Sequence, residues 1–358
     1  MHQSEQGQLK GPWSKVVARS GKAGFGLWAL LLAFALPAAA SVPETEKLML
    51  SGHGPEDAVP WDFEIDGGHG ESRSGTIPVP SNWQQQGYGH YQYGYDKGPR
   101  VGDHAVYHRR FAIPSAWKGK TIRLVFDGVM TDTLVKVNGQ VAGPVHQGGF
   151  NRFSYDITAL VKPGEQNSLD VHVSEASAAK DTDIAERHGD YWAFGGIYRP
   201  VWLEAVPAQS ISHVAIDAKA SGALTADVTL AAPRTVTHLV GQLVDTAGRP
   251  VGQPLTADIP AGGAGRIRLL GQFDHPALWS AETPNLHALD VTLFDGDQPV
   301  HHVVRRFGFR TFEVREGAGL FLNGQRIMLK GVNRHSFRPE TGRALNRADA
   351  YADVRTIR

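Results

Sequence analysis

Histidines are the first candidates for chemistry in this chain, but their spacing does not favour a catalytic or metal-binding role. There are 16 of them, scattered along the chain, and no H-E-x-x-H motif occurs. His104 and His108 lie in a strand-like run, where this spacing is not a helical face. We therefore predict surface or structural histidines and no metal site. The sequence also has no G-x-x-x-x-G-K-[ST] loop, no G-x-G-x-x-G after a strand and no G-x-S-x-G elbow, which argues against nucleotide-dependent and serine-hydrolase chemistry.

Composition sets the class of protein. The chain has 358 residues, of which 41% are apolar and 20% charged, as expected for two or three soluble domains. Lys+Arg and Asp+Glu both number 36, so no net charge favours nucleic acid or an anionic membrane, and we predict no nucleic-acid partner. The absence of cysteine excludes disulfides, thiolate metal sites and a cysteine nucleophile.

The first 40 residues have the pattern of a signal peptide. Basic residues between Lys10 and Lys22 precede the apolar run L-W-A-L-L-L-A-F-A-L (27–36), which is followed by P-A-A-A-S. The run is shorter than the roughly 20 residues that span a bilayer, so an uncleaved anchor is the weaker alternative. We predict cleavage after Ala40, export to the periplasm or the exterior, and no membrane association of the mature chain.

Residues 41–206 have an all-β pattern. Apolar residues alternate with polar ones at 121–127, 153–157 and 169–173, which indicates strands with one buried face. Asn138-Gly139 between short apolar runs predicts a hairpin. Many short strands with frequent turns predict a β-sandwich or jelly roll.

A second β block covers residues 207–312. Alternation at 224–230 and 289–293 and an apolar run at 239–244 predict further strands. About one hundred residues of this kind suit an immunoglobulin-like sandwich, although the Cys and Trp hallmarks of antibody domains are missing.

Several motifs, in order, resemble those of glycoside hydrolase family 2, the group of β-galactosidases, β-glucuronidases and β-mannosidases. The first block contains H-Q-G-G-F-N-R-F-S-Y-D (146–156) and G-D-Y-W-A-F-G-G-I-Y-R-P (189–200), similar to the sugar-binding jelly roll. The second contains L-W-S-A-E-T-P-N-L (278–286) and R-F-G-F-R-T-F-E (306–313), similar to the immunoglobulin-like domain. Residues 319–343 resemble the start of the catalytic (β/α)8 barrel, which typically needs about 250 residues. The resemblance implies an all-β front portion, with residues 313–358 as a truncated barrel start.

The resemblance also implies substrate-binding residues in the jelly roll. Asp190 corresponds to a loop that, in β-galactosidases, contacts the terminal sugar or a sodium ion. A carboxylate accepts two or more charge-assisted hydrogen bonds from sugar hydroxyls, and Trp192 offers an apolar face. The alternatives are that Asp190 caps the Gly195-Gly196 turn and that Trp192 belongs to the core.

Asn333, Arg334 and His335 are the further candidates for sugar binding. They follow the apolar segment 327–332, which we predict to be the first barrel strand, and barrel active sites form at the C-terminal ends of strands. In family members Arg and His at these positions shape the sugar pocket; the alternative is that Arg334 and His335 brace loops. Arg338 stands where β-galactosidases of the family often have His.

No catalytic residue is predicted in this chain. Glycoside hydrolysis by a retaining enzyme needs two carboxyl groups about 5–5.5 Å apart, and the family has both as glutamates on later barrel strands. Glu313, Glu316 and Glu340 are interpreted as surface carboxylates. We therefore expect the front portion of a secreted retaining β-glycosidase, most like a β-galactosidase, that is inactive alone.

The expected partner is a carbohydrate, a β-glycoside. No cofactor is predicted, although sodium or magnesium and a homo-oligomer are features that the resemblance allows for the full-length protein. The alternative from another class is a non-catalytic carbohydrate-binding or scaffold module.

Overall fold

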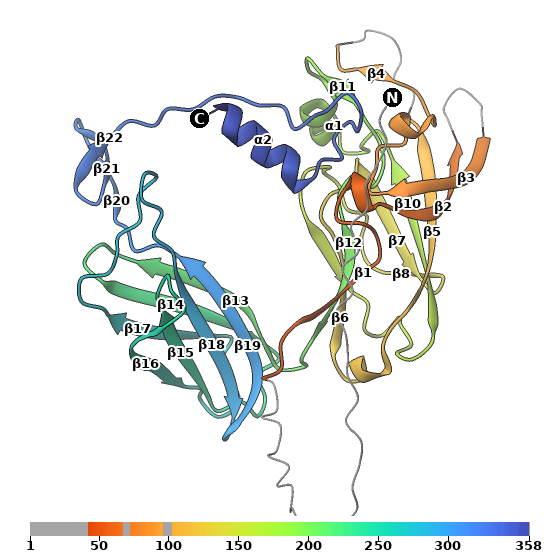
Figure 1. Cartoon of the computed structure of the whole chain (residues 1–358). Helices are drawn as coiled ribbons and strands as arrows, with labels where there is room; N and C mark the ends of the chain where they lie inside the picture. Colours follow the sequence, from red (N-terminus) through yellow and green to blue (C-terminus); the bar gives the residue numbers. More distant parts are fainter. Residues whose placement is uncertain (1–41, 67–71, 96–101, 358) are drawn as a thin grey trace, which may run out of the picture. The chain divides into compact units, whose positions relative to one another are not determined.

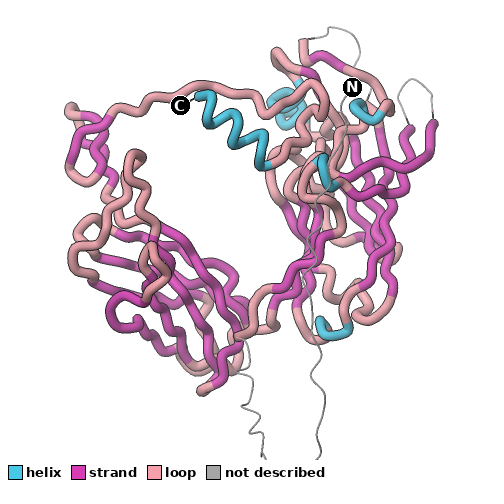
Figure 2. Tube along the Cα trace, viewed as in Figure 1, coloured by secondary structure: helices cyan, strands magenta, loops and turns pink. Residues whose placement is uncertain are grey.

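The computed structural model describes residues 42–66, 72–95 and 102–357 (Figure 1). Strands make up most of the regular structure in these ranges, as Figure 2 shows. The expected signal peptide, 1–40, lies outside the described residues. Among the helices within them, none combines the length and the apolar character needed to cross a membrane.

The first sandwich consists of two main antiparallel sheets and a short ribbon. The sheets have the strand orders β1-β12-β6-β9 and β3-β2-β5-β10-β7-β8, and the ribbon pairs β4 with β11. The strands are β1 (Glu46–Met49), β2 (Val59–Asp66), β3 (Ser72–Val79), β4 (Gln92–Tyr93), β5 (His104–Ala112), β6 (Thr121–Phe126), β7 (Asp132–Val137), β8 (Gln140–Val141), β9 (Phe153–Asp156), β10 (Gln166–Ser174), β11 (Trp192–Ala193) and β12 (Val201–Val206). The helical segments are η1 (Pro55–Asp57), η2 (Gln84–Gln86), η3 (Ser115–Trp117) and α1 (Lys180–Arg187).

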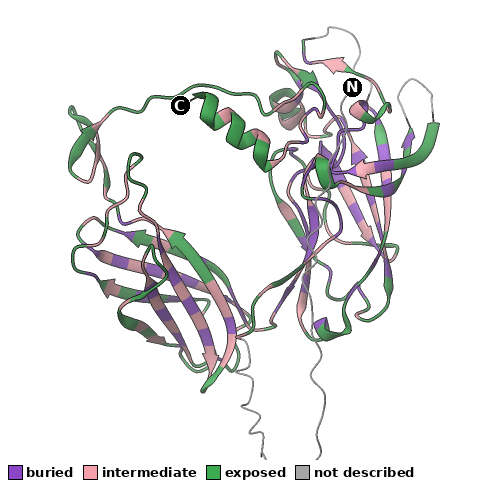
Figure 3. Cartoon of the chain, viewed as in Figure 1, coloured by how far each residue is buried: buried purple, intermediate pink, exposed green. Residues whose placement is uncertain are grey.

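Alternation of apolar residues builds the core between these sheets. In β10, Leu169, Val171 and Val173 are buried while their neighbours are partly exposed, a pattern visible as alternating colours in Figure 3. Phe63 and Tyr107 meet near the middle of the core with ring centroids 4.8 Å apart, edge to face. The hairpin predicted at Asn138-Gly139 joins β7 to β8 and is confirmed.

The second sandwich has the immunoglobulin-like arrangement of a three-stranded and a four-stranded sheet. The orders are β13-β14-β17 and β16-β15-β18-β19. Leu239, Leu269 and Val291 are fully buried between the sheets. The strands are β13 (Ser210–Ala218), β14 (Ala223–Ala231), β15 (His238–Val244), β16 (Pro250–Asp258), β17 (Arg266–Gln272), β18 (His287–Asp295) and β19 (Gln298–Phe307). The predicted fold class, a jelly roll followed by an immunoglobulin-like sandwich, is confirmed.

The C-terminal part begins with a small antiparallel sheet, β20-β21-β22. Its strands are Phe312–Arg315, Gly319–Leu322 and Gln325–Ile327. The prediction of a strand over 327–332 is wrong for this structure, because β22 ends at Ile327 and residues 328–337 have no regular structure. A parallel barrel strand needs hydrogen-bonding neighbours and cover on both faces. The described residues offer neither, and Met328 and Leu329 are 79% and 72% exposed.

Helix α2 (Arg347–Ile357) is the last described element. Asn346 begins it with a reciprocal cap, because the Asp349 backbone N–H donates to Asn346 Oδ1 (2.8 Å) and the Asn346 N–H donates to Asp349 Oδ2 (3.0 Å). All of its residues are at least partly exposed.

Candidate functional site

A two-stranded ribbon presents aromatic rings at one edge of the first sandwich. In the register of β4 and β11, Tyr93 lies opposite Trp192 and Gln92 lies opposite Ala193. Tyr91 precedes β4 and its ring lies 6.1 Å from that of Trp192, whereas Tyr95 follows β4 in a turn and its ring lies 6.0 Å from that of Tyr93. The rings of Tyr93 and Trp192 are 5.5 Å apart between centroids, in an edge-to-face pair.

Close packing onto Trp83 fixes the chain after this ribbon. A Cβ on Gly195 would lie 2.0 Å from Cζ2 of the Trp83 indole, so only glycine fits there. The Gly195 N–H donates to Gln84 Oε1 (3.0 Å), and the Gly195 carbonyl accepts from Asn82 Nδ2 (3.0 Å). The first glycine of the G-G motif at 195–196 therefore allows this loop to pack directly against the core residue Trp83.

The buried guanidinium of Arg187 holds the loop that precedes Gly195. Arg187, at the end of α1, donates to the Phe194 carbonyl (2.6 Å) and to the Thr131 hydroxyl. Burial lowers the pKa of the Arg187 guanidinium, while the nearby Glu175 carboxylate acts in the opposite direction. The first bond joins the two ends of the 187–194 segment, and the second ties them to Thr131 of the sandwich, so the segment is held in place.

The segment 337–344 packs against this part of the jelly roll. The Phe337 ring stacks on Phe194 with centroids 5.7 Å apart. The Arg343 guanidinium lies over two rings, 5.2 Å from the centroid of Phe150 and 5.4 Å from that of Tyr191. Burial lowers the pKa of Arg343. Three of the sequence motifs, at 146–156, 189–200 and 319–343, thus meet at one place.

Beside these contacts lies a cavity of about 310 Å³ that is partly open to solvent. Four aromatic rings, an imidazole, a carboxylate and a guanidinium line it: Tyr93, Asp190, Tyr191, Trp192, His335, Phe337 and Arg343. Mostly apolar walls with a few polar groups are typical of small-molecule sites. The Tyr93 hydroxyl donates to Asp190 Oδ1, and the His335 ring lies 6.3 Å from that of Tyr191.

Three of the five predicted binding residues, Asp190, Trp192 and His335, line this cavity. The other two do not. Asn333 is exposed, and Arg334 donates to the Ser336 hydroxyl (3.0 Å) and pairs with Asp353 of α2. Their placement differs from the prediction because the strand expected to position them is not formed.

Both alternatives for the jelly-roll residues can be compared with the geometry. Trp192 is 46% exposed, so the interpretation as a core residue is wrong. The Gly195 backbone is bonded to Gln84 and Asn82, whereas Asp190 accepts from Tyr93. The Asp190 carboxylate therefore lines the cavity and bonds to Tyr93 rather than capping the Gly195-Gly196 turn.

Sequence reasoning missed Tyr93, Tyr191, Phe337 and Arg343. A signal for the first was present, because the segment Y-G-H-Y-Q-Y-G-Y (88–95) has four tyrosines and two glycines in eight residues. Arg343 and Phe337 gave no such signal, since their role depends on contacts with residues far away in the sequence.

Among the described residues, Asp190 is the one carboxylate that lines the cavity. Glu313 pairs with Arg315 (2.8 Å) on β20, and neither Glu316 nor Glu340 lines the cavity. Within the described ranges no group of three or more histidine, aspartate and glutamate side chains could hold a metal ion. One carboxylate that already accepts from Tyr93 does not complete the sodium site that the family resemblance allows, and no chemical step is assigned to an ion here.

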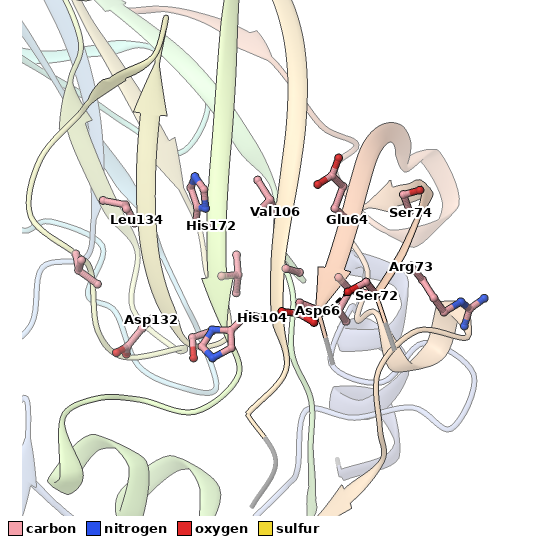
Figure 4. Close-up of a pocket in the computed structure, with 15 residues that line it drawn as sticks. Glu64, Asp66, Ser72, Arg73, Ser74, His104, Val106, Asp132, Leu134 and His172 are labelled. Atoms are coloured by element: carbon pink, nitrogen blue, oxygen red, sulfur yellow. Dashed lines mark hydrogen bonds between the residues drawn. The ribbon is translucent and has the colours of Figure 1, made fainter. Parts of the chain in front are cut away.

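A larger groove, of about 640 Å³, lies over the outward face of β2, β5, β10 and β7 (Figure 4). Carboxylates and imidazoles such as Glu64, Asp66, His104 and His172 line it, and no aromatic carbocycle does. Burial, with Lys136 acting in the same direction, lowers the pKa of His172. The smaller cavity at Asp190 is the better candidate site, because it combines aromatic walls with polar groups.

Comparisons with known proteins agree with this organisation. The model of the glycosyl hydrolases family 2 sugar binding domain matches residues 33–207, that of glycosyl hydrolases family 2 matches 209–310, and that of the family 2 TIM barrel domain matches 312–358.

The similar curated proteins include a β-galactosidase and a putative β-glucuronidase. A β-galactosidase of Halalkalibacterium halodurans is 32% identical over 303 residues, covering 79% of this chain and 29% of the relative. A putative β-glucuronidase of Formosa agariphila is 30% identical over 265 residues, covering 70% of this chain and 30% of the relative. The chain thus spans less than a third of the length of these curated relatives.

Solved structures share the fold. A putative β-galactosidase from Bacteroides fragilis superposes with a TM-score of 0.69 at 22% identity, covering 87% of this chain and 48% of the other. With the successive family matches, these findings show that the chain belongs to glycoside hydrolase family 2.

Proposed function

We propose that this chain provides the accessory domains and one wall of the sugar pocket of an exported retaining β-glycosidase. The observation that carries the proposal is the cavity itself, in which Asp190 and Trp192 of the jelly roll meet His335 of the barrel start. A β-galactoside is the substrate we favour and a β-glucuronide the second candidate, because relatives of both names match the chain.

The cavity suits one sugar ring held by its hydroxyl groups. The Tyr93 hydroxyl fixes one oxygen of Asp190, and the second oxygen accepts hydrogen bonds from ligand hydroxyls. The rings of Tyr191 and Trp192 offer apolar surface to the C–H faces of the sugar. His335 adds a further donor or acceptor at the other side of the cavity.

Hydrolysis by this chain alone is not expected. A retaining enzyme needs an acid and a nucleophile about 5–5.5 Å apart, whereas Asp190 is the only carboxylate that the described part of the chain brings to the cavity. The catalytic glutamates would come from later barrel strands, as in the family. We expect the 358-residue chain to bind monosaccharides in the millimolar range or more weakly, since one wall cannot bury most of a ligand.

The test compares this chain with a fusion in which a complete family barrel follows Glu313. We expect the fusion to hydrolyse aryl β-galactosides or β-glucuronides and the 358-residue chain to show no turnover above background. In the fusion, Asp190→Ala should lower kcat/KM by about tenfold or more, since a charge-assisted hydrogen bond contributes about 1.5–3 kcal/mol. Asp297→Ala, in an exposed turn of the second sandwich, is the matched control and should have no effect. Robust hydrolysis by the 358-residue chain that disappears on changing Glu313 or Glu340 would contradict the proposal.

Export is a separate part of the proposal. The leader pattern supports removal of residues 1–40, so N-terminal sequencing of secreted protein should begin at Ser41. A mature protein that retains Trp28 would indicate an anchor instead.

The alternative function is a carbohydrate-binding module that acts without a barrel. The exposed aromatic rings at the cavity rim favour it as the second candidate. Tight, micromolar binding of an oligosaccharide by this chain, with no activity of the fusion, would support this alternative.

A further inference from the structure

Two exposed tyrosines outside the cavity, Tyr91 and Tyr95, extend the aromatic wall that Tyr93 and Trp192 form inside it. We define the aromatic platform as Tyr91, Tyr93, Tyr95 and Trp192. We propose that the aromatic platform is a second subsite, which binds the leaving-group side of a β-glycoside: an aryl group or the next pyranose ring. This inference rests on the proposed function and extends it.

The rings of the aromatic platform form a continuous chain. Centroids are 6.1 Å apart between Tyr91 and Trp192, 5.5 Å between Trp192 and Tyr93, and 6.0 Å between Tyr93 and Tyr95, all edge to face. Edge-to-face contacts fix each ring against its neighbour. The aromatic platform is therefore ordered by its own contacts before any ligand binds.

The same rings are exposed to an extent that packing does not explain. Tyr91 is 54% exposed, Tyr95 63% and Trp192 46%, whereas Trp61, Trp83 and Tyr107 of the same sandwich are at most 1% exposed. Large aromatic side chains contribute most to stability when buried. Single exposed rings are ordinary, but neighbouring ones that form a patch mark a binding surface.

The backbone beneath the aromatic platform is held rigidly. A Cβ on Gly94 would lie 2.2 Å from the Gly189 carbonyl oxygen, so the two loops approach as closely as glycine allows. The Gly94 N–H donates to the Tyr191 carbonyl (2.8 Å), and the Tyr91 hydroxyl donates to the Gln84 carbonyl (3.2 Å). A prearranged surface lowers the entropy cost of binding.

Tyr93 connects the aromatic platform with the cavity. Its hydroxyl donates to Asp190 inside the cavity, while its ring contacts Trp192 and Tyr95. Tyr91 and Tyr95 do not line the cavity. A ligand with one ring at Asp190 and a second ring beyond it would lie across Tyr93 and reach Tyr95.

The ligand's orientation follows from the proposed activity. A glycosidase that removes a terminal sugar binds that sugar in its pocket, here the cavity at Asp190, so the rest of the substrate lies outside the cavity. Aromatic faces favour flat apolar surfaces such as an aryl ring or the C–H face of a pyranose. Because Tyr91 and Tyr95 lie outside the cavity that receives the terminal sugar, the aromatic platform fits the leaving group.

Ligand-observed NMR with the 358-residue chain tests this directly. The probes are the methyl and the 4-nitrophenyl β-D-galactosides and the corresponding β-D-glucuronides. We expect the aryl form of the bound sugar to bind about tenfold more tightly than its methyl form, the range of one or two aromatic contacts. Tyr91→Ala and Tyr95→Ala should remove this difference and leave methyl glycoside binding unchanged. Tyr351→Ala, an equally exposed ring on α2, is the matched control and should change neither.

The outcomes separate this inference from the proposed function. Equal binding of methyl and aryl forms, or an aryl preference that survives both substitutions, overturns the second subsite and leaves the sugar pocket intact. A loss of methyl glycoside binding in Tyr91→Ala or Tyr95→Ala also overturns it, because these rings would then belong to the pocket. Ligand-observed NMR also registers binding weaker than millimolar, so the absence of any binding signal from all four glycosides overturns the sugar pocket and the second subsite together.

Discussion

Strand β10 and the segment 327–332 are both apolar stretches, but only the first is a buried strand. Leu169, Val171 and Val173 point into the core, and β10 is paired along its length with β5 and in part with β7. In the other segment Met328, Leu329 and Val332 are exposed. A strand with alternating apolar residues needs cover on one face only, and the facing sheet of the same sandwich supplies it. A continuous apolar run requires two covered faces and strands on both sides.

The largest effect expected from this difference concerns a leucine in each segment. Leu169→Ala should lower the free energy of unfolding by about 2–5 kcal/mol, because Leu169 is fully buried and its removal leaves a cavity. Leu329→Ala should change it by less than about 0.5 kcal/mol, since Leu329 is 72% exposed. Urea unfolding followed by tryptophan fluorescence measures both. A large loss for Leu329→Ala would mean that residues 328–337 pack in solution, as β10 does.

Two glycines differ in the same way as the two leucines, since one is closely packed and the other is not. Gly195→Ala should destabilise the first sandwich by about 1–3 kcal/mol, because the added methyl group would overlap the Trp83 indole. Gly331→Ala is the matched control: its Cβ would meet no atom within 4 Å, and little change is expected. The same unfolding assay applies. A neutral Gly195→Ala would show that the loop carrying Asp190 can move away from Trp83.

Much of the fold was predictable from alternation alone. The alternating segments 121–127, 153–157 and 169–173 correspond to β6, β9 and part of β10. A strand with one buried face needs an apolar residue at every second position, so its burial can be recognised from the sequence. The strand at 327–332 could not be predicted correctly, since its formation depends on neighbours rather than on its own composition.

The candidate site was predictable only in part. Asp190, Trp192 and His335 were found through the family resemblance, and they do meet in one cavity. Arg343 was missed because its position between Phe150 and Tyr191 is a tertiary contact without local pattern. The exposure of Trp192 was also unpredictable, because the same residue type fills the core at Trp61 and Trp83.

Residues 43–45 offer a third case, a segment without regular structure that side chains nevertheless hold. His301 of β19 is buried; its Nδ1 accepts from the Ile211 N–H (2.9 Å) and its Nε2 lies 3.2 Å from the Thr45 hydroxyl. His302 bonds to Glu44 (3.0 Å) and to Asp290. Anchoring of this kind distinguishes these residues from 328–337.

The two histidines should respond to pH in opposite directions. Burial, with His302 and Arg305 acting in the same direction and Glu44 against it, lowers the pKa of His301 from 6.5 to about 4. Burial acts to lower the pKa of His302 as well, but the bonds to Glu44 and Asp290 outweigh it and raise that pKa. Protonation therefore opposes folding at His301 and favours it at His302.

The pH prediction concerns His301, whose unfolded form binds a proton before the folded form does. Its contribution to stability is present above pH 6.5 and is lost as the pH falls towards about 4. His301→Gln should flatten the dependence of the unfolding free energy on pH in this window relative to the unchanged chain. Comparing the two proteins cancels the titration of other histidines, such as His146 and His287. If the unfolding free energy had the same pH slope in both proteins, the neutral form of His301 would not be what stabilises its contacts with Ile211 and Thr45.

The smallest effect is expected at the start of α2, which is ordered by its own cap rather than by burial. Asn346→Ala removes the bond that Asn346 Oδ1 accepts from the Asp349 N–H and the bond from Asn346 Nδ2 to Glu56 Oε2 (3.1 Å). The backbone N–H of residue 346 can still donate to Asp349 Oδ2. Loss of such a cap costs about 0.5–2 kcal/mol of helix stability. Because no residue of α2 is buried, the loss should stay local. Amide hydrogen exchange within 350–354 should therefore become faster, while the urea midpoint of the sandwiches stays unchanged.

Arg355→Ala, near the other end of the helix, is the control for Asn346→Ala and should leave the exchange rates within 350–354 as they are. If Asn346→Ala instead lowered global stability as much as Leu169→Ala, the barrel start would share the cooperative unit of the sandwiches, and burial would not be what separates the two regions.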